Sequence, residues 1–345
     1  MSEGVFTQVA FGRQTAVGTA VAATTKFPVD AGFLGFELDR ATEVPDEDTG
    51  VSSRYYPGRG SHGIRWATAS LPFVMRFEDI MHVFEMHVDA ISGGTPTGTA
   101  SPYTWGYTFD ETGSLLSSAV KPYTIEYGVD GSTQDEWQAH TVIADTLELG
   151  FDALSAPGNS MWKGTLGLVA LDRVQTAIVG TCTAPTTLET MEGHFTTFQA
   201  GGTGTAFASL ATLDGTLKQF SISSTLGATG RAYGGTTDKA TAIGRGSKPE
   251  ITFEGLIAIS SDTDAEFLDQ FNVSGALAQE RRLRLTVDGT GVNSLTIDFR
   301  AMLSAVNLGE HENEHLYAIS GFCVYDSTLG GRMTFTLTNA VATIP

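Results

Sequence analysis

The chain has 345 residues and combines 39 acidic with 20 basic side chains, for a formal net charge of −19. Acids outnumber bases in both halves and no basic run with interleaved aromatics occurs, which excludes nucleic-acid binding through the phosphates as a main function. Hydrophobic residues reach 41%, yet no stretch approaches the ~20 apolar residues of a membrane span. We therefore expect a folded protein made in the cytosol and long enough for two domains.

The first half is predicted to be rich in strands, since forty glycines accompany many Thr, Val, Ile and Phe residues. One helix is expected over residues 77–91, because the apolar side chains there recur at helical spacing on a single face. Apolar alternation predicts strands at residues 5–11, 33–38, 64–74, 103–109, 122–128, 140–151 and 161–171.

Residues 41–60 predict one long exposed loop. Pro45 and Gly50 break regular structure there, and the carboxylates between them need water. A loop of this length is more often functional than decorative. Its acidic side chains are Glu43, Asp46, Glu47 and Asp48.

The second half repeats the order of the first. A helix is expected near residues 264–272, with Thr263 and Glu266 as its capping box. Each half is then a handful of antiparallel strands with one helix that covers one face or one end. The strands are expected at residues 250–259, 282–288, 294–300, 315–325 and 332–343.

Four short sequence blocks recur in the same order in the two halves. Blocks that begin at residues 58, 108, 123 and 162 return as blocks that begin at residues 244, 286, 295 and 332. Gly and Thr are abundant, so each block alone is weak, but four in order predict an internal duplication. We expect a first β domain over residues 1–180 and a second over residues 181–345.

His311-Glu312-Asn313-Glu314-His315 matches H-E-x-x-H, the zinc-protease motif. That motif needs a helix to place both histidines on one face, and the residues that follow alternate like a strand. No third His or Glu ligand follows His315. We interpret the stretch as a charged turn between two strands, with no metal, no cofactor and no enzymatic activity. A metal hydrolase that uses His311 and His315 stays as a minor alternative.

Residues 11–20, which read FGRQTAVGTA, resemble the G-x-E/Q-T-x-x-G-T-A opening of the tail tube (major tail) proteins of long-tailed bacteriophages. Gln14 stands where a Glu is often seen in that family. The closing strands, residues 325–327 and 333–340, are similar to the end of those proteins. The resemblance extends loosely over the whole chain, and its motifs are short.

The resemblance implies a mainly β fold: two tandem copies of a β-sandwich or partial barrel, each with one flanking helix. It also implies a structural virion protein, made and assembled in the bacterial cytoplasm, whose rings stack into a hollow tail tube. Family members form six-unit rings, so three two-unit chains would close one ring with pseudo-sixfold symmetry. Tape-measure, tail terminator and distal tail proteins are implied partners, and DNA would pass through without specific binding.

Two groups of acids receive roles from this resemblance. The 41–60 loop is expected to order against a neighbouring ring, and its deletion to block stacking. Glu126 and its repeat partner Asp298 are candidate acids facing the lumen. A different class of function stays open: a carbohydrate-binding β-sandwich of a virion or cell surface. Its stacking platforms would be Trp66, Trp105, Trp137, Trp162, Tyr55 and Tyr56.

Overall fold

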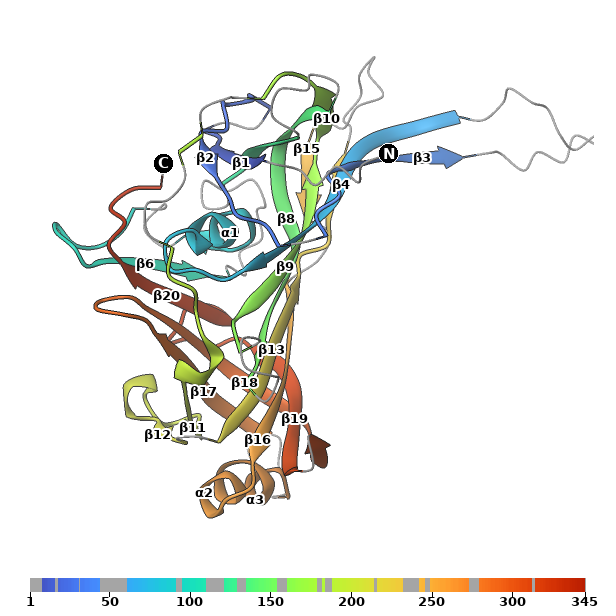
Figure 1. Ribbon diagram of the computed structural model, residues 1–345. Helices are drawn as coiled ribbons and strands as arrows, with labels where there is room; N and C mark the ends of the chain where they lie inside the picture. The colour runs from blue at the N-terminus through green and yellow to red at the C-terminus, as the bar shows by residue number, and fades with distance from the viewer. Residues whose placement is uncertain are drawn as a thin grey trace, which may run out of the picture.

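The chain is mainly β, as expected, with strands that pair antiparallel throughout one large sheet system (Figure 1). The computed structural model describes residues 8–15, 18–30, 32–43, 61–90, 95–109, 121–128, 135–153, 160–178, 182–183, 188–213, 216–231, 242–245, 249–272, 279–311 and 314–344.

The described residues of the first half form ten strands and helix α1 (Ile80–His87). The strands are β1 (Gln8–Arg13), β2 (Thr25–Lys26), β3 (Glu37–Glu43), β4 (Ser61–Val74), β5 (Asp89–Ala90), β6 (Tyr103–Thr108), β7 (Tyr123–Gly128), β8 (Glu136–Asp152), β9 (Lys163–Ala170) and β10 (Asp172–Gln175).

In the second half, the part that the structure describes forms ten further strands and a helical segment. That segment consists of α2 (Ser261–Thr263), a π-helical turn η4 (Asp264–Leu268) and α3 (Asp269–Asn272). The strands are β11 (Thr196–Gly202), β12 (Ala211–Thr212), β13 (Leu217–Thr225), β14 (Ala228–Arg231), β15 (Ala242–Arg245), β16 (Glu250–Ala258), β17 (Glu280–Asp288), β18 (Ser294–His311), β19 (Glu314–Val324) and β20 (Met333–Asn339).

Several expected elements are corrected by these bounds. The second strand starts at Glu37 rather than residue 33, since Gly32 and Gly35 have positive φ angles that interrupt an extended chain. The helix predicted over residues 77–91 is confined to Ile80–His87. The capping box of the second helix uses Ser260 and Thr263, not Thr263 and Glu266. Strands β11 to β15 were not predicted.

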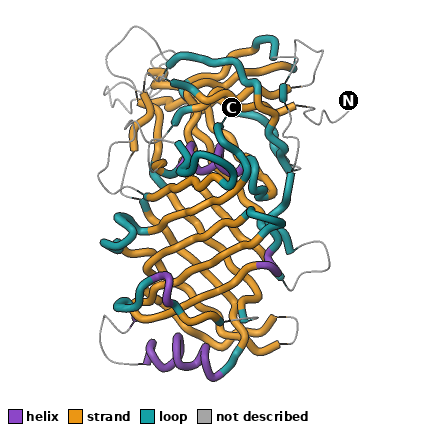
Figure 2. Tube along the Cα trace, turned by 90° about the vertical axis from the view of Figure 1, so that its left-hand side faces the viewer, coloured by secondary structure: helices purple, strands orange, loops and turns teal. Residues whose placement is uncertain are grey.

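One layer of the sheet runs without a break through both halves, and we call it the wall. Figure 1 displays it along the right-hand side of the molecule, and Figure 2 shows how the strands of the two layers cross. Strands β8 and β18 bend from the wall into a second layer, in which β7 and β10 pair with β8, and β17 and β20 pair with β18. Each carries a β-bulge at the bend, at Asp145 and at Ser304. The strand order of the wall is β3, β4, β9, β8, β13, β16, β19 and β18.

The two halves use the same order of strand pairing. In the first half β1 pairs with β7, β7 with β8, β8 with both β10 and β9, β9 with β4, and β4 with β3. In the second half β11 pairs with β17, β17 with β18, β18 with both β20 and β19, β19 with β16, and β16 with β13. A helix separates β4 from β7 and β16 from β17 at the matching place. The strands named here therefore pair in the same order in both halves.

This pairing changes two of the sequence equivalences. Strand β4 matches β16, as the repeat blocks predict, but β7 matches β17 rather than residues 295–299. In the same way β9 matches β19, so the equivalence of residues 162–168 with 332–338 is wrong. Alternating Thr and apolar residues occur in most strands here, so short blocks cannot identify which strand matches which.

A single hydrophobic core fills the space between the layers and continues across the expected boundary at residue 180. Phe84 of α1 stacks on Phe335 of β20, with ring centroids 4.5 Å apart. Strand β6 of the first half also pairs with β20 of the second. The halves share one core, so neither is closed on its own.

Candidate functional site

The candidate site is the face of the wall that points away from the core. Along β13 and β16 apolar side chains such as Phe220 and Phe253 alternate with polar ones, so one face packs inward and the other stays open. The open face bears mostly hydroxyl, amide and carboxylate groups. Its residues, which we call the wall face, include Thr146, Glu148, Asp152, Lys163, Thr165, Gln219, Ser221, Ser223, Thr225, Glu250, Thr252, Glu254, Asn307 and Ser320.

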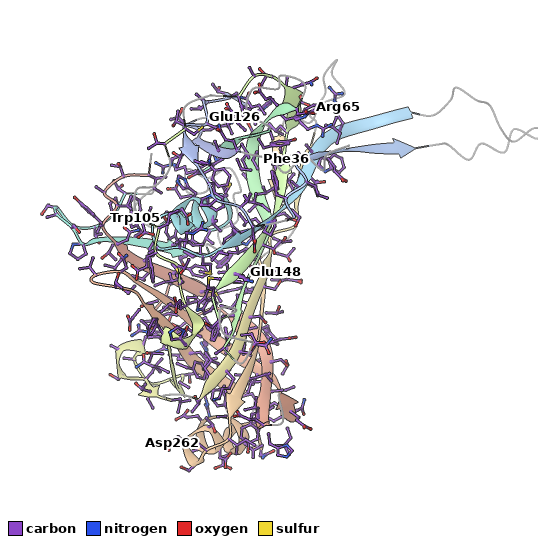
Figure 3. All side chains as sticks on the ribbon, in the orientation of Figure 1. Phe36, Arg65, Trp105, Glu126, Glu148 and Asp262 are labelled. Atoms are coloured by element: carbon purple, nitrogen blue, oxygen red, sulfur yellow. The ribbon has the colours of Figure 1, made fainter. Side chains whose placement is uncertain are left out.

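The wall face is hollowed where the two halves meet. A hollow of about 490 Å³ lies over β9, β8, β13 and β16, and a smaller one of about 310 Å³ continues over β16, β19 and β18. Glu148 lies at the middle of the wall, between the halves (Figure 3). The hollow is therefore shared by the two halves and crosses the β8–β13 pair.

Acids dominate the charge of the wall face. The wall-face residues named above include four acids, Glu148, Asp152, Glu250 and Glu254, and one base, Lys163. The carboxylates are spaced by hydroxyl side chains: Glu148 lies opposite Ser223 and Thr165, and Glu254 opposite Ser221 and Ser320. A concave acidic surface of this kind repels polyanions, because its low-dielectric walls concentrate the field.

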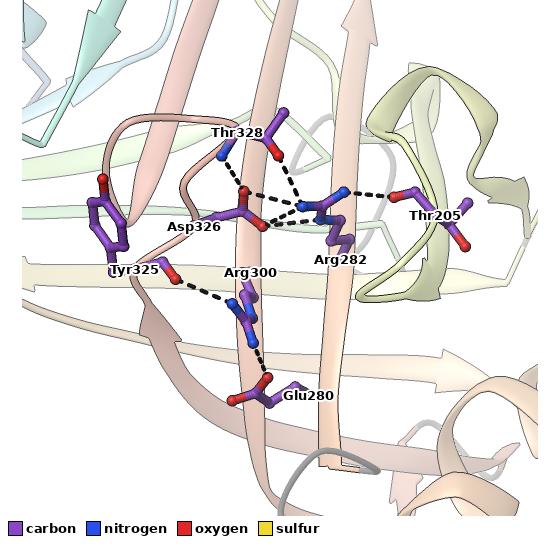
Figure 4. Close-up of polar contacts among 7 residues, drawn as sticks. All are labelled: Thr205, Glu280, Arg282, Arg300, Tyr325, Asp326 and Thr328. Carbon is purple, nitrogen blue, oxygen red and sulfur yellow. Dashed lines mark hydrogen bonds and ion pairs between the residues drawn. The ribbon is translucent and has the colours of Figure 1, made fainter.

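The arginines of the second layer are neutralised, in contrast. Arg282 of β17 donates to both carboxylate oxygens of Asp326, at 2.9 and 3.2 Å, and to the Thr205 carbonyl at 2.8 Å (Figure 4). Arg300 of β18 pairs with Glu280 and donates to the Tyr325 carbonyl at 3.4 Å. These contacts fasten the 205 and 325–328 segments to the sheet and leave little free positive charge on that side.

Helix α1 carries a buried polar cluster, and the pKa values of several of its ionisable groups are shifted. Glu85 pairs with Arg13 at 2.7 Å and accepts a hydrogen bond from the Tyr123 hydroxyl at 2.9 Å. Burial raises the pKa of Glu85, although Arg13 opposes this, and burial lowers the pKa of His82 to about 4. The cluster faces the core and opens on neither hollow, so it holds α1 in place.

The two acids expected to face a lumen do not lie on the wall face. Glu126 is 2% exposed and accepts hydrogen bonds from Gln138 at 2.9 Å and from the Ala23 amide at 3.4 Å. Asp298 is 8% exposed and is held by both nitrogens of Arg284, at 2.6 and 2.8 Å. They also lie on β7 and β18, which are not matching strands. Burial within the single chain contradicts a lumen-facing role for both.

Of the acids expected in the 41–60 loop, Glu43 alone lies among the described residues. Glu43 is the last residue of β3, so the predicted loop begins after it and not at residue 41. Asp46, Glu47 and Asp48 lie outside the described residues. The wall-face acids were missed, although the alternation of Ser with Phe and Ile in residues 219–224 is a strand signal that could have revealed part of the face.

The described residues of the H-E-x-x-H stretch lie in strands β18 and β19 and not in a helix, while Glu312 and Asn313 lie outside the described residues. His311 ends β18 opposite Glu314, and His315 of β19 lies opposite Glu310. In the part of the chain that the structure describes, no group of three or more His, Cys, Asp or Glu side chains could hold a metal ion. The geometry that gives this motif its zinc chemistry is absent from these strands.

The aromatic residues considered as stacking platforms are mostly part of the core. Trp105 and Trp162 are fully buried, and Trp66 and Trp137 pack against the core from its margin. The guanidinium carbon of Arg173 lies 4.4 Å from the centroid of the Trp137 ring. Tyr55 and Tyr56 lie outside the described residues.

Comparison with known proteins adds no family to this geometry. No protein-family model matches the sequence, and no curated protein is significantly similar to it. None of the helices in the described residues is long and apolar enough to cross a membrane.

Proposed function

We propose that this chain is a duplicated tail-tube subunit that closes into rings, which stack into a hollow tube for the passage of DNA. The observation that carries the proposal is the wall. It crosses from one half to the other by strand pairing between β8 and β13, and its outer face is hollowed where the two halves meet. A unit that pairs in this way with a copy of itself can do so again with the next chain.

Repeated topology supports the duplicated form. The pairing order of β1, β7, β8, β10, β9, β4 and β3 recurs in β11, β17, β18, β20, β19, β16 and β13, with a helix at the matching position in each half. Three chains would then supply six similar units to a ring. A single shared core favours a chain that acts as one rigid double unit.

The charge of the wall face supports the passage of DNA. Duplex DNA carries one negative charge per about 1.7 Å of its axis, so phosphates adhere to basic surfaces and slide past acidic ones. The wall face offers small hydroxyl groups and acids, and the arginines of the second layer are paired with carboxylates. This arrangement fits a channel lining better than a binding site.

Negative-stain imaging combined with native mass measurement of the purified chain tests the proposal. We expect rings or tubes with a central hole, and a ring mass of about 110 kDa, three times the 36.5 kDa of one chain. A chain that stays monomeric at all concentrations, or particles without a hole, would refute it.

A further inference from the structure

The junction between the halves supplies a template for a contact between chains. Seven residues of β13, from Gln219 to Thr225, pair with β8 between Asp152 and Thr146. His87 of α1 is 2.7 Å from the Ser224 hydroxyl across the same junction. The bulged residue Asp145 accepts the Leu226 amide at 2.8 Å on its carbonyl, and the Ala228 amide on its carboxylate.

Past the junction, the hairpin of β14 and β15 folds onto the first half. Strand β14 packs against β4, β8 and β9, and Ala228 and Ile243 are buried there. The β14–β15 hairpin lies between β13 and β16 in the chain. The outer ends of β3 and β4 occupy the matching position in the first half. The β3–β4 hairpin instead projects beyond the body of the molecule (Figure 1).

Each element of this junction has an open counterpart. Among the described strands, β3 pairs with β4 alone, and the C-terminal part of β18 pairs with β19 alone. Leu149 and Leu308 each lie four residues after the bulge of their strand, so they occupy matching positions. Val169 of β9 and Phe322 of β19 each pair with the residue two positions before the bulge, so they match as well.

Exposure separates the counterparts sharply. Leu149 is 2% exposed and Val169 is 5% exposed, whereas Leu308 is 74% and Phe322 is 43% exposed. On the other open edge, Leu38 of β3 is also exposed. Large apolar side chains left in water at both edges, at positions that the internal junction buries, indicate surfaces that are covered on assembly.

We infer that the β3–β4 hairpin docks laterally on the second half of another copy of this chain, pairing β3 with β18 and covering β19. The inference rests on the proposed ring and names its chain-to-chain contact. Transfer of the internal register places Glu37 opposite Asn307, as Ser223 lies opposite Glu148. The hairpin then joins neighbours within one ring rather than successive rings.

Disulfide trapping in the full-length chain tests this contact. In Glu37→Cys with Asn307→Cys, oxidation should give cross-linked dimers and trimers on a non-reducing gel, because opposed residues of an antiparallel pair lie within about 5.5 Å at Cβ. Ser223→Cys with Glu148→Cys is the matched internal control and should link within one chain. Glu37→Cys with Ser320→Cys, one strand away from the expected partner, should stay largely unlinked, as should the wild-type chain with Cys182 and Cys323.

The outcomes separate this contact from the proposed function. Rings that form without the 37–307 link, while the 223–148 link forms, would overturn the lateral contact and leave the ring in place. Absence of both rings and the 37–307 link would overturn both. Mixing the two single variants should give linked dimers and no larger species, since each chain then carries one reactive edge.

Discussion

Two hairpins of matching position behave differently in this molecule. The one that runs from β13 to β16 bends at Gly227, where φ is positive, and its strand β14 lies on the first half. The one that runs from β3 to β4 stays continuous and projects (Figure 1). The hairpin of the second half is thus docked on the first half, whereas the matching hairpin of the first half is undocked.

This difference teaches that the β13 edge of the second half is covered by the first half, while the matching β3 edge of the first half is open. The helical segments of the two halves also differ in burial. All residues of α1 are buried beneath neighbouring elements, whereas Thr263 and Phe267 are the buried residues described in Ser261–Asn272. Burial in this chain is therefore decided by contacts between units more than by local sequence.

The largest expected effect comes from leucines at matching positions. Leu149→Ala should lower the free energy of unfolding of the free chain by about 2–5 kcal/mol, since it leaves a cavity in a packed junction. Leu308→Ala should change it by less than about 0.5 kcal/mol, because that side chain is already in water, but should weaken assembly. Urea unfolding at low protein concentration measures both. Equal losses would break the comparison.

An ion pair on each helix sharpens the comparison next. Arg13→Met leaves the fully buried Glu85 without its cation and should cost about 2–3 kcal/mol, below the full cost of a broken buried pair because Arg13 is partly exposed and Tyr123 remains. Glu266→Gln in the second half should cost less than about 1 kcal/mol, since its contact with Arg281 is 3.8 Å and partly exposed. Thermal unfolding of the two variants at one pH compares them, and a larger loss for Glu266→Gln would contradict this ranking.

Asp79, at the N-terminus of α1, and His82, within it, should make the stability of the first half depend on pH in opposite directions. Burial raises the pKa of Asp79 to about 7, so its contribution to stability is present below about pH 3.8 and is lost as the pH rises towards 7. Burial lowers the pKa of His82 from 6.5 to about 4, so its contribution is present above about pH 6.5 and is lost as the pH falls towards 4.

Asp79→Asn removes one of these opposed contributions. Its free energy of unfolding should fall more steeply than that of the wild type between pH 6.5 and pH 4, because one of the carboxyl groups that oppose the effect of His82 is then absent. His82→Gln should reverse the trend and gain stability relative to the wild type on acidification. Urea unfolding across this range checks both, and parallel curves for all three proteins would show that neither group titrates as described.

How far the sequence predicts this molecule differs between fold and site. Apolar periodicity identifies the mainly β class, most strands of the first half and α1, because each signal is local. Strand β13 escapes it, because the adjacent Ser223 and Ser224 cut short the alternation of Phe220 and Ile222 with polar residues. The site is harder still. Glu148 meets Ser223 only through pairing across more than seventy residues, and Glu126 is covered by the Ala23 segment, a contact that alternation cannot reveal.

A smaller effect on stability, but a visible one on function, is expected from charge reversal on the wall face. Glu148→Lys with Glu254→Lys should leave unfolding within about 0.5 kcal/mol yet make assembled particles retain DNA at low salt and release it at higher salt. Asp262→Lys with Asp288→Lys, exposed acids off the wall face, makes the same change in charge and should retain far less. Gel mobility of DNA with each particle measures this; equal retention would remove the wall face as the channel lining.

The smallest effect is expected at the β18–β19 hairpin. His311→Ala with His315→Ala should change the free energy of unfolding by less than about 1 kcal/mol and leave assembly intact, because these strands lack the helical geometry of a zinc site. Metal analysis of the wild-type protein is the accompanying measurement. Zinc bound in a one-to-one ratio, and lost in the double variant, would contradict it.

A three-dimensional reconstruction of the assembled particle tests the central claim most directly. It should contain six similar β units around one channel, with β18 of each chain paired to β3 of the next as β8 is paired to β13, and with Glu148 and Glu254 facing the channel. A map in which the wall breaks between chains, or in which this face points away from the axis, would contradict the account.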